Sequence, residues 1–154
     1  MKNVVKEIDF LKKAKLNLFK KNIKNIRRKL LNYYKLANAC EIKHKVFKFN
    51  LLEGLKYYDY DFAVSPYQFA VEIETGEKIV SVGFNKKAIW VDYEEDIVED
   101  FKRLNKFKFK GFTQQEIKDV CEVVYKISTY IDEVVKVIGP YIENEVEKYL
   151  NNLR

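Results

Sequence analysis

The residues with the clearest chemical potential are bases that lie close together near the start of the sequence. Between Phe10 and Ala37 there are ten Lys and Arg residues and no Asp or Glu. Such side chains neutralise phosphate groups, and the release of counterions then drives binding to nucleic acid. On one helix these bases would form a stripe about 30 Å long at 1.5 Å per residue. The predicted binding residues are Lys13, Lys20, Lys21, Lys24, Arg27, Arg28 and Lys35.

The same stripe has less specific explanations. Residues 1–50 carry 15 bases and three acids, whereas residues 51–154 carry 14 bases and 20 acids, so the overall net charge is only +6. The bases could face acidic elements of the same chain, an anionic membrane surface or only solvent. The leading hypothesis is an interaction protein whose basic first helix contacts nucleic acid or an acidic protein.

Four carboxylates form a second candidate site. Asp59 and Asp61 share one side of an expected strand, and Glu72 and Glu74 share one side of another. If these strands pair, the carboxylates could converge on Mg²⁺ or Mn²⁺ and support phosphodiester hydrolysis. The alternative function is therefore a metal-dependent nuclease or phosphoesterase. Solvated carboxylates opposite a core face have the same spacing, and this structural explanation is favoured.

Other reaction chemistry has little support in the sequence. His44 is the only histidine, which excludes metal sites that need several His ligands and proton relays between two His. Cys40 and Cys121 stand alone, without the short spacing of a metal or redox motif. The five glycines are isolated from one another, so no glycine-rich phosphate loop is present. We expect no cofactor, and binding is favoured over catalysis.

Composition points to a reducing, cytoplasmic setting. Isolated cysteines are typical of proteins whose thiols stay reduced. The longest run without a charge, Phe62 to Val71, has ten residues, about half of a membrane span. No secretory signal is recognisable at the start of the sequence. The high Lys and Glu content also favours a thermophilic protein.

The bases must be positioned by a long first helix, expected from about Asn3 to Asn38. From Leu16 onward its apolar residues alternate spacings of three and four, which predicts a heptad seam. A second seam of the same spacing is expected on a helix that a capping box at Thr113 and Glu116 opens. Gly139 and Pro140 predict the end of that helix and the start of a last one. The two seams consist of Leu16, Phe19, Ile23, Ile26, Leu30, Tyr33 and Ala37, and of Ile117, Val120, Val124, Ile127, Ile131, Val134 and Ile138.

The carboxylates must be positioned by strands, because apolar residues alternate between Glu41 and Asp92. The expected strands are 46–49, 57–64, 69–74, 79–84 and 88–91, joined as an antiparallel meander with the last one central in the sheet. A capping box at Asp92 and Glu95 predicts a shorter middle helix through Leu104. The alternating residues Lys106 to Lys110 predict a short edge strand.

These elements predict a single α+β domain over residues 1–154. An antiparallel meander of about four or five strands would be covered by long N- and C-terminal helices and the shorter middle helix. The two seams can pack inside one chain, which is favoured, or between chains in a homodimer. A homo-oligomeric structural subunit without a ligand is thus a third hypothesis for function.

Overall fold

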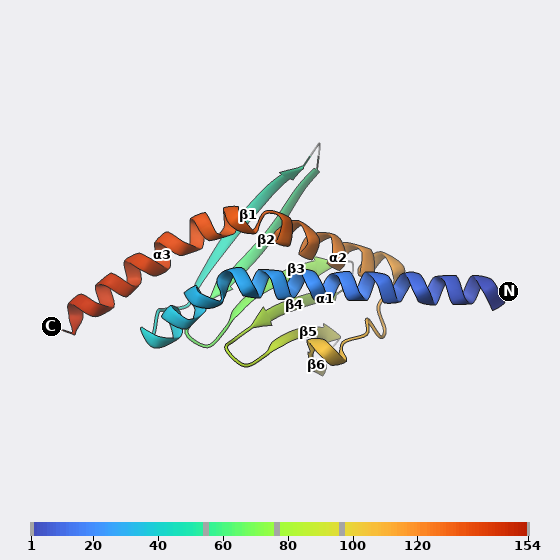
Figure 1. The fold of residues 1–154 in the computed structure, drawn as a ribbon, viewed down its shortest axis with the longest axis horizontal. Coiled ribbons are helices and arrows are strands. Elements are labelled where there is room, and N and C mark those ends of the chain that lie inside the picture. Colours follow the sequence, from blue (N-terminus) through green and yellow to red (C-terminus); the bar gives the residue numbers. More distant parts are fainter. Residues whose placement is uncertain (1, 54–55, 76–77, 96–97, 154) are drawn as a thin grey trace.

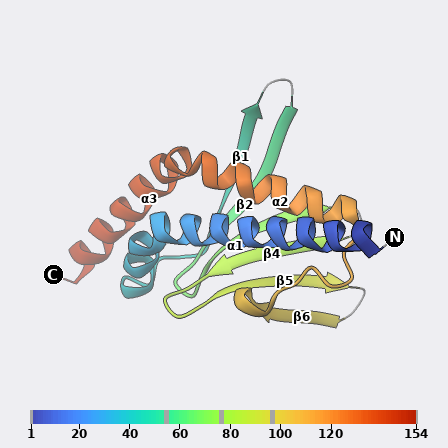
Figure 2. The same cartoon turned by 45° about the vertical axis from the view of Figure 1, so that its right-hand side comes forward.

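The fold is a six-stranded sheet with all three α-helices on one face (Figures 1 and 2). It comes from a computed structural model that describes residues 2–53, 56–75, 78–95 and 98–153, with side chains for 12–50, 60–75, 78–93 and 103–153. The helices are α1 (Lys2–Ala39), α2 (Gln114–Thr129) and α3 (Ile131–Asn152), and η1 (Leu104–Lys106) is a short 3₁₀ turn. The strands are β1 (Lys45–Glu53), β2 (Lys56–Val64), β3 (Phe69–Thr75), β4 (Lys78–Phe84), β5 (Ile89–Glu95) and β6 (Val98–Arg103). The expected α+β class is confirmed.

Each strand pairs antiparallel with the next one along the chain, so the sheet is a meander without crossovers. Its register puts apolar side chains of neighbouring strands opposite one another on the helix-covered face. Val71 is opposite both Phe62 and Val82, and Val82 is opposite Val91. All four side chains are buried. The alternation of apolar and polar residues along the sequence therefore corresponds to the two faces of the sheet.

Both heptad seams pack within the chain, and all of their residues are buried except Leu16 and Tyr33, which are half-buried. On α1 the residues Phe19, Ile23 and Leu30 are at most 2% exposed, and the seam that runs through α2 and α3 is buried as well. The helix α1 packs against both α2 and α3 along this line. The favoured packing inside one chain is thus what the structure contains, while the homodimer stays a prediction.

Three expectations about local structure are wrong. The helix expected from Asp92 to Leu104 is instead the end of β5, the strand β6 and the first residue of η1, with residues 96–97 outside the described part. Every second residue of this segment faces the helices, as in a strand. Val91 and Tyr93 are buried on that face, and Val91 pairs with Val82 on β4. Burial and strand pairing outweigh the local capping signal. Since β6 adds an edge strand, β5 lies inside the sheet as expected.

The edge strand expected at Lys106 to Lys110 is also absent, because the chain leaves η1 as an irregular segment that runs to α2. The helix break expected at Gly139 lies at Tyr130 instead, and Pro140 is inside α3. Gly139 has a packing role there, since an added Cβ would lie 2.9 Å from the hydroxyl oxygen of Tyr33 on α1. Gly139 therefore allows α1 and α3 to approach closely, and α3 continues through it.

No helix in the described part of the chain is long and apolar enough to cross a membrane.

Among the side chains that the structure describes on the open face of the sheet, Trp90 on β5 is the large one that is buried. It is opposite Gly83 on β4, and its ring lies over the space that a side chain at position 83 would fill. A Cβ built on Gly83 would come within 2.4 Å of Cζ2 of Trp90. Glycine inside a strand commonly marks such a close approach.

We therefore expect Gly83→Ala to lower the free energy of unfolding by about 2 kcal/mol, because the indole ring must leave its position over β4. Urea denaturation of the variant and the wild type measures this difference. Ser81→Ala, on the same face of the same strand, serves as the control and should change stability by less than about 0.5 kcal/mol. An equal or higher stability for Gly83→Ala would contradict the close packing.

Candidate functional site

A cleft lined by bases lies between α1 and the opposite wall formed by the β4–β5 turn, η1 and the segment 107–112. It consists of two hollows of about 680 Å³ and 330 Å³ that share Lys20. Among the residues that the structure describes, no acid lines either hollow. We call this feature the basic cleft, and its cations are Lys12, Lys13, Lys20, Lys24, Arg27, Lys87, Arg103, Lys108 and Lys110.

The wall formed by α1 contains part of the predicted stripe. Burial of Phe19, Ile23 and Leu30 turns the intervening Lys20 and Lys24 to the side of the helix next to the core. Bases spaced seven, four and three residues apart, from position 13 to position 27, stay on one side of a helix over about 21 Å. The cleft thus contains four of the seven predicted residues, namely Lys13, Lys20, Lys24 and Arg27.

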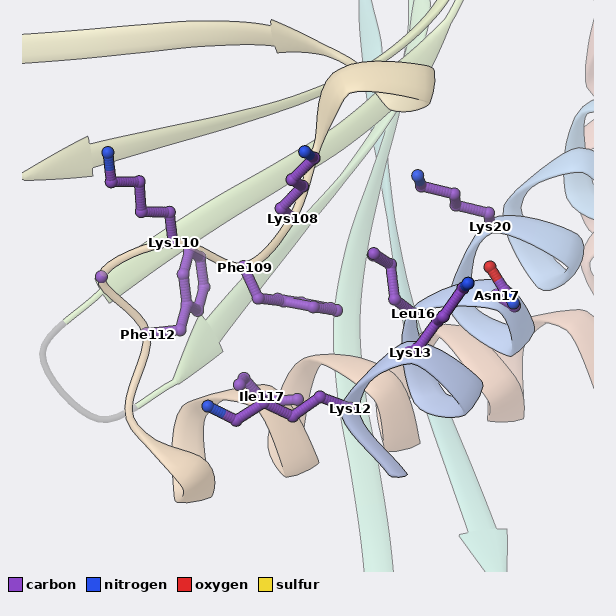
Figure 3. A pocket seen from close by; sticks show the side chains of 11 residues that line it. Lys12, Lys13, Leu16, Asn17, Lys20, Lys108, Phe109, Lys110, Phe112 and Ile117 are labelled. Carbon is purple, nitrogen blue, oxygen red and sulfur yellow. The ribbon is translucent and has the colours of Figure 1, made fainter. Parts of the chain in front are cut away.

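The segment 107–112 forms the other wall next to the larger hollow (Figure 3). Phe107 and Phe109 are buried, while Lys108 and Lys110 are exposed. The phenylalanine rings anchor the segment: Phe109 lies 5.0 Å from Phe19 on α1 and 4.7 Å from Phe107, measured between ring centroids. The alternation of Lys and Phe therefore holds two cations at the edge of the cleft without a strand.

The backbone of this segment has an unusual conformation. Phe109 has a φ of 56° and Gly111 a φ of 85°. The left-handed region is open to glycine but disfavoured for a bulky side chain such as phenylalanine. Packing of the Phe109 ring against Phe19 offsets that cost and keeps the segment folded over the cleft.

Like charges crowd at the point where the two hollows meet. Burial lowers the pKa of Lys20, and the positive charges of Lys24 and Lys108 lower it further. Lys24 lies one turn from Lys20 on α1, whereas Lys108 lies on the opposite wall, so the repulsion from Lys108 acts across the cleft. A bound anion at this point would relieve the repulsion and favour the charged form of Lys20.

Arg27 connects the two walls of the smaller hollow. Its Nε donates to the carbonyl oxygen of Asn85 at 3.3 Å, and its Nη2 donates to that of Lys86 at 2.7 Å. The Asn85 side chain in turn accepts from the backbone N–H groups of Lys87 and Ala88, both at 2.9 Å. These bonds hold the β4–β5 turn against α1 and place Lys87 in the cleft, so Arg27 has a structural role there.

The end of the segment 107–112 is held by the capping box that the sequence predicts. The Thr113 hydroxyl accepts from the Glu116 N–H at 3.1 Å, and the Thr113 N–H donates to the Glu116 carboxylate at 2.8 Å. Nζ of Lys78 on β4 is 3.1 Å from both oxygens of the same carboxylate. Glu116 is 6% exposed, and these contacts connect the sheet, the segment and the start of α2.

The other three predicted bases lie outside the basic cleft. Lys21 and Arg28 border a third hollow between α1 and α2, which Lys24 also lines and where Arg28 donates to Asn25 at 2.8 Å. Lys35 is exposed on the last third of α1. The fold therefore divides the predicted stripe into a part that faces the cleft and a part that faces outward.

The predicted carboxylate site is brought together only in part. Asp61 on β2 is directly opposite Glu72 on β3, and Lys48 on β1 is opposite Asp61. Glu74 lies two residues further along β3, and the side chain of Asp59 is outside the described part. Within the described residues, no group of three or more His, Cys, Asp or Glu side chains is placed to hold a metal ion.

Neither cysteine is part of a disulfide. Both Cys40 and Cys121 are free and half-buried. Burial raises the pKa of Cys121 to about 11, despite the opposing charge of Lys15, so this thiol stays protonated at neutral pH. His44, the only histidine, is exposed directly before β1.

Comparisons of the chain with protein-family models, with curated proteins and with solved structures find no match.

Five cations of the basic cleft are absent from the predicted stripe, namely Lys12, Lys87, Arg103, Lys108 and Lys110. The alternation of Lys and Phe at positions 106–110 was the sequence pattern that pointed to Lys108 and Lys110. Lys87 and Arg103 follow from the sheet topology, since the β4–β5 turn and the end of β6 lie at the same end of the sheet. No local pattern in the sequence marks them.

The contacts of Glu116 predict how stability depends on pH. Burial alone would raise the pKa of Glu116, but hydrogen bonds from Thr113 and Lys78 and the Lys78 charge outweigh burial and lower it. A lowered folded-state pKa gives stability that is complete above the unfolded value of 4.5 and is lost as pH falls through the folded value.

We expect Glu116→Gln to lower the free energy of unfolding by about 2 kcal/mol at neutral pH, because Lys78 loses a charged acceptor. The difference from the wild type should shrink below pH 4.5. Urea denaturation between about pH 2 and pH 7 measures both effects. Glu133→Gln, which removes an exposed pair with Lys136, is the control and should have little effect at any pH. A difference independent of pH would argue against this ion pair.

Proposed function

We propose that the protein binds nucleic acid in the basic cleft. The observation that supports this most is the concentration of nine cations on two facing walls, with no acid among the described lining residues. Lysines that follow a backbone in this way replace condensed counterions, whose release supplies most of the binding free energy. Asn17 and Asn105 also line the cleft and have amide groups that can donate to phosphate oxygens.

The electrostatics favour a ligand with closely spaced negative charges. Burial lowers the pKa of Lys20, and the positive charges of Lys24 and Lys108 lower it further, so an anion beside these three side chains would favour the charged form of Lys20. Duplex DNA carries one charge per about 1.7 Å of its axis, so several phosphates fit along the α1 wall. An acidic protein is the competing ligand, and a competition experiment separates the two classes.

Fluorescence anisotropy of labelled DNA and RNA oligonucleotides tests the proposal. If six or more phosphates are contacted, affinity should fall about 10³-fold between roughly 50 and 200 mM salt. The triple variant Lys13→Gln, Lys20→Gln, Lys108→Gln removes cations from both walls and leaves the structural contacts of Arg27 intact. For single strands its slope of log affinity against log salt should be smaller by about 2.

The matched control is the triple variant Lys21→Gln, Lys29→Gln, Lys35→Gln, which removes the same charge from exposed positions of α1. It should keep most of the affinity. Equal losses in the two variants would move the site to the outer face of α1. Displacement of the oligonucleotide by polyglutamate at equal charge concentration would favour an acidic protein as ligand. No binding at low salt would refute the proposal.

A further inference from the structure

The two hollows of the basic cleft differ in their chemistry. The smaller one is lined by cations together with Ala88, Ile89, Leu104 and Asn105. The larger one has five lysines around a floor of Leu16, Phe109, Phe112 and Ile117. Two aromatic rings thus lie beneath a rim of positive charge in the larger hollow, which we call the aromatic hollow.

The lysines of the aromatic hollow come from both walls. In Figure 3, Lys108 and Lys110 extend from the segment 107–112, and Lys13 and Lys20 extend from α1 on the other side. The volume of about 680 Å³ is in the range of small-molecule sites, and the hollow is open to solvent. A ligand that enters can therefore contact cations on two sides and an apolar surface below.

The aromatic floor is held by several ring contacts. The rings of Phe109 and Phe112 are 5.5 Å apart between centroids at 78°, and each also packs on Phe107. Phe112 further contacts Tyr93 at 5.3 Å, and Nζ of Lys78 lies 5.4 Å from its ring centroid. Phe109 is buried, whereas Phe112 is half-buried and is therefore the more accessible of the two residues.

Backbone geometry is a second, independent observation at the same place. Phe109 adopts a left-handed conformation with a φ of 56°, which bulky residues disfavour. This conformation lets Lys108 and Lys110 lie on one rim with the Phe109 ring turned inward beneath them. Disfavoured conformations of this kind concentrate at ligand sites.

We propose that the aromatic hollow binds an unpaired nucleobase, whose flanking phosphates lie on the surrounding lysines. This inference rests on the proposed function and makes it specific for single strands. Single-strand binders combine aromatic side chains that stack on bases with cations that follow the backbone. In a duplex the bases are already stacked and paired, so they cannot reach the floor of the hollow without unstacking.

Three labelled ligands of equal phosphate count test the inference by anisotropy: a thymidine oligonucleotide, an abasic oligonucleotide and a duplex. Stacking on an aromatic side chain should make the base-bearing strand bind about 10-fold to 100-fold more tightly than the abasic strand. This comparison uses the wild-type protein, so it does not depend on a variant that folds.

Variants of Phe112 then locate the effect. Phe112→Leu keeps an apolar side chain but removes the ring, and it should reduce the preference for bases to about twofold or less. Phe112→Tyr keeps the ring and should keep the preference. Tyr67→Leu, at a 79% exposed position in the β2–β3 turn, is the matched control and should change nothing. Thermal unfolding of each variant shows whether it is folded.

The outcomes separate the two proposals. Equal, salt-sensitive affinity for base-bearing and abasic strands would overturn the aromatic hollow as a base site and leave the basic cleft as a phosphate site. Tighter binding to the duplex, or a full base preference in folded Phe112→Leu, would also overturn it. If none of the three ligands binds at low salt, both proposals fail.

Discussion

The burial of the apolar seam of α1 is the constraint on which the rest of the structure depends. Residues such as Phe19, Ile23 and Leu30 are almost fully inaccessible to solvent, between the sheet and the other two helices. The same helix has ten bases and no acid between positions 10 and 37, so self-repulsion opposes its folding. Apolar packing is what holds this charge in place, since the lysines between the seam residues have no acidic partner on their own helix.

That constraint explains why the charge is concentrated in a cleft. Once the seam faces the core, the neighbouring positions of α1 lie at the edge of the core and not on the far side of the helix. The chain from β6 to α2 must pass this edge, and its phenylalanines pack on Phe19 while its lysines point outward. Repulsion between Lys20 and Lys108 is the consequence, and burial of Glu116 against Lys78 keeps the segment in place despite it.

Much of the fold could be predicted because it depends on periodicity. The alternation of apolar and polar residues predicted the meander, and alternating spacings of three and four predicted both seams, which pack within the chain. The failures have one physical cause. At Asp92, at Lys106 and at Gly139 the local residue types favour a helix start, a strand and a helix end, respectively. Tertiary contacts instead determine the secondary structure at all three places. Gly139 is the clearest case, because the Tyr33 ring fills the space of its missing side chain.

The predicted stripe covered only the wall of the candidate site that one helix supplies. Lys13, Lys20, Lys24 and Arg27 share a face through helical spacing alone, whereas Lys87 and Arg103 reach them through the register of the sheet. Spacing also could not distinguish the inward part of the stripe from Lys21, Arg28 and Lys35. That distinction depends on which side of α1 the segment 107–112 crosses, and this segment is some 90 residues further along the chain.

The choice of cation has a consequence for specificity. Seven of the nine cations in the basic cleft are lysines, and Arg27 already donates to two backbone carbonyls. Arginine reads base edges through paired hydrogen bonds, while lysine acts as a point charge on a flexible stem. A lysine-lined cleft is therefore suited to a backbone of any sequence, and an aromatic floor accepts any base that is free to stack. Under the proposed function, ligand choice would follow strand state and charge, and base sequence would matter little.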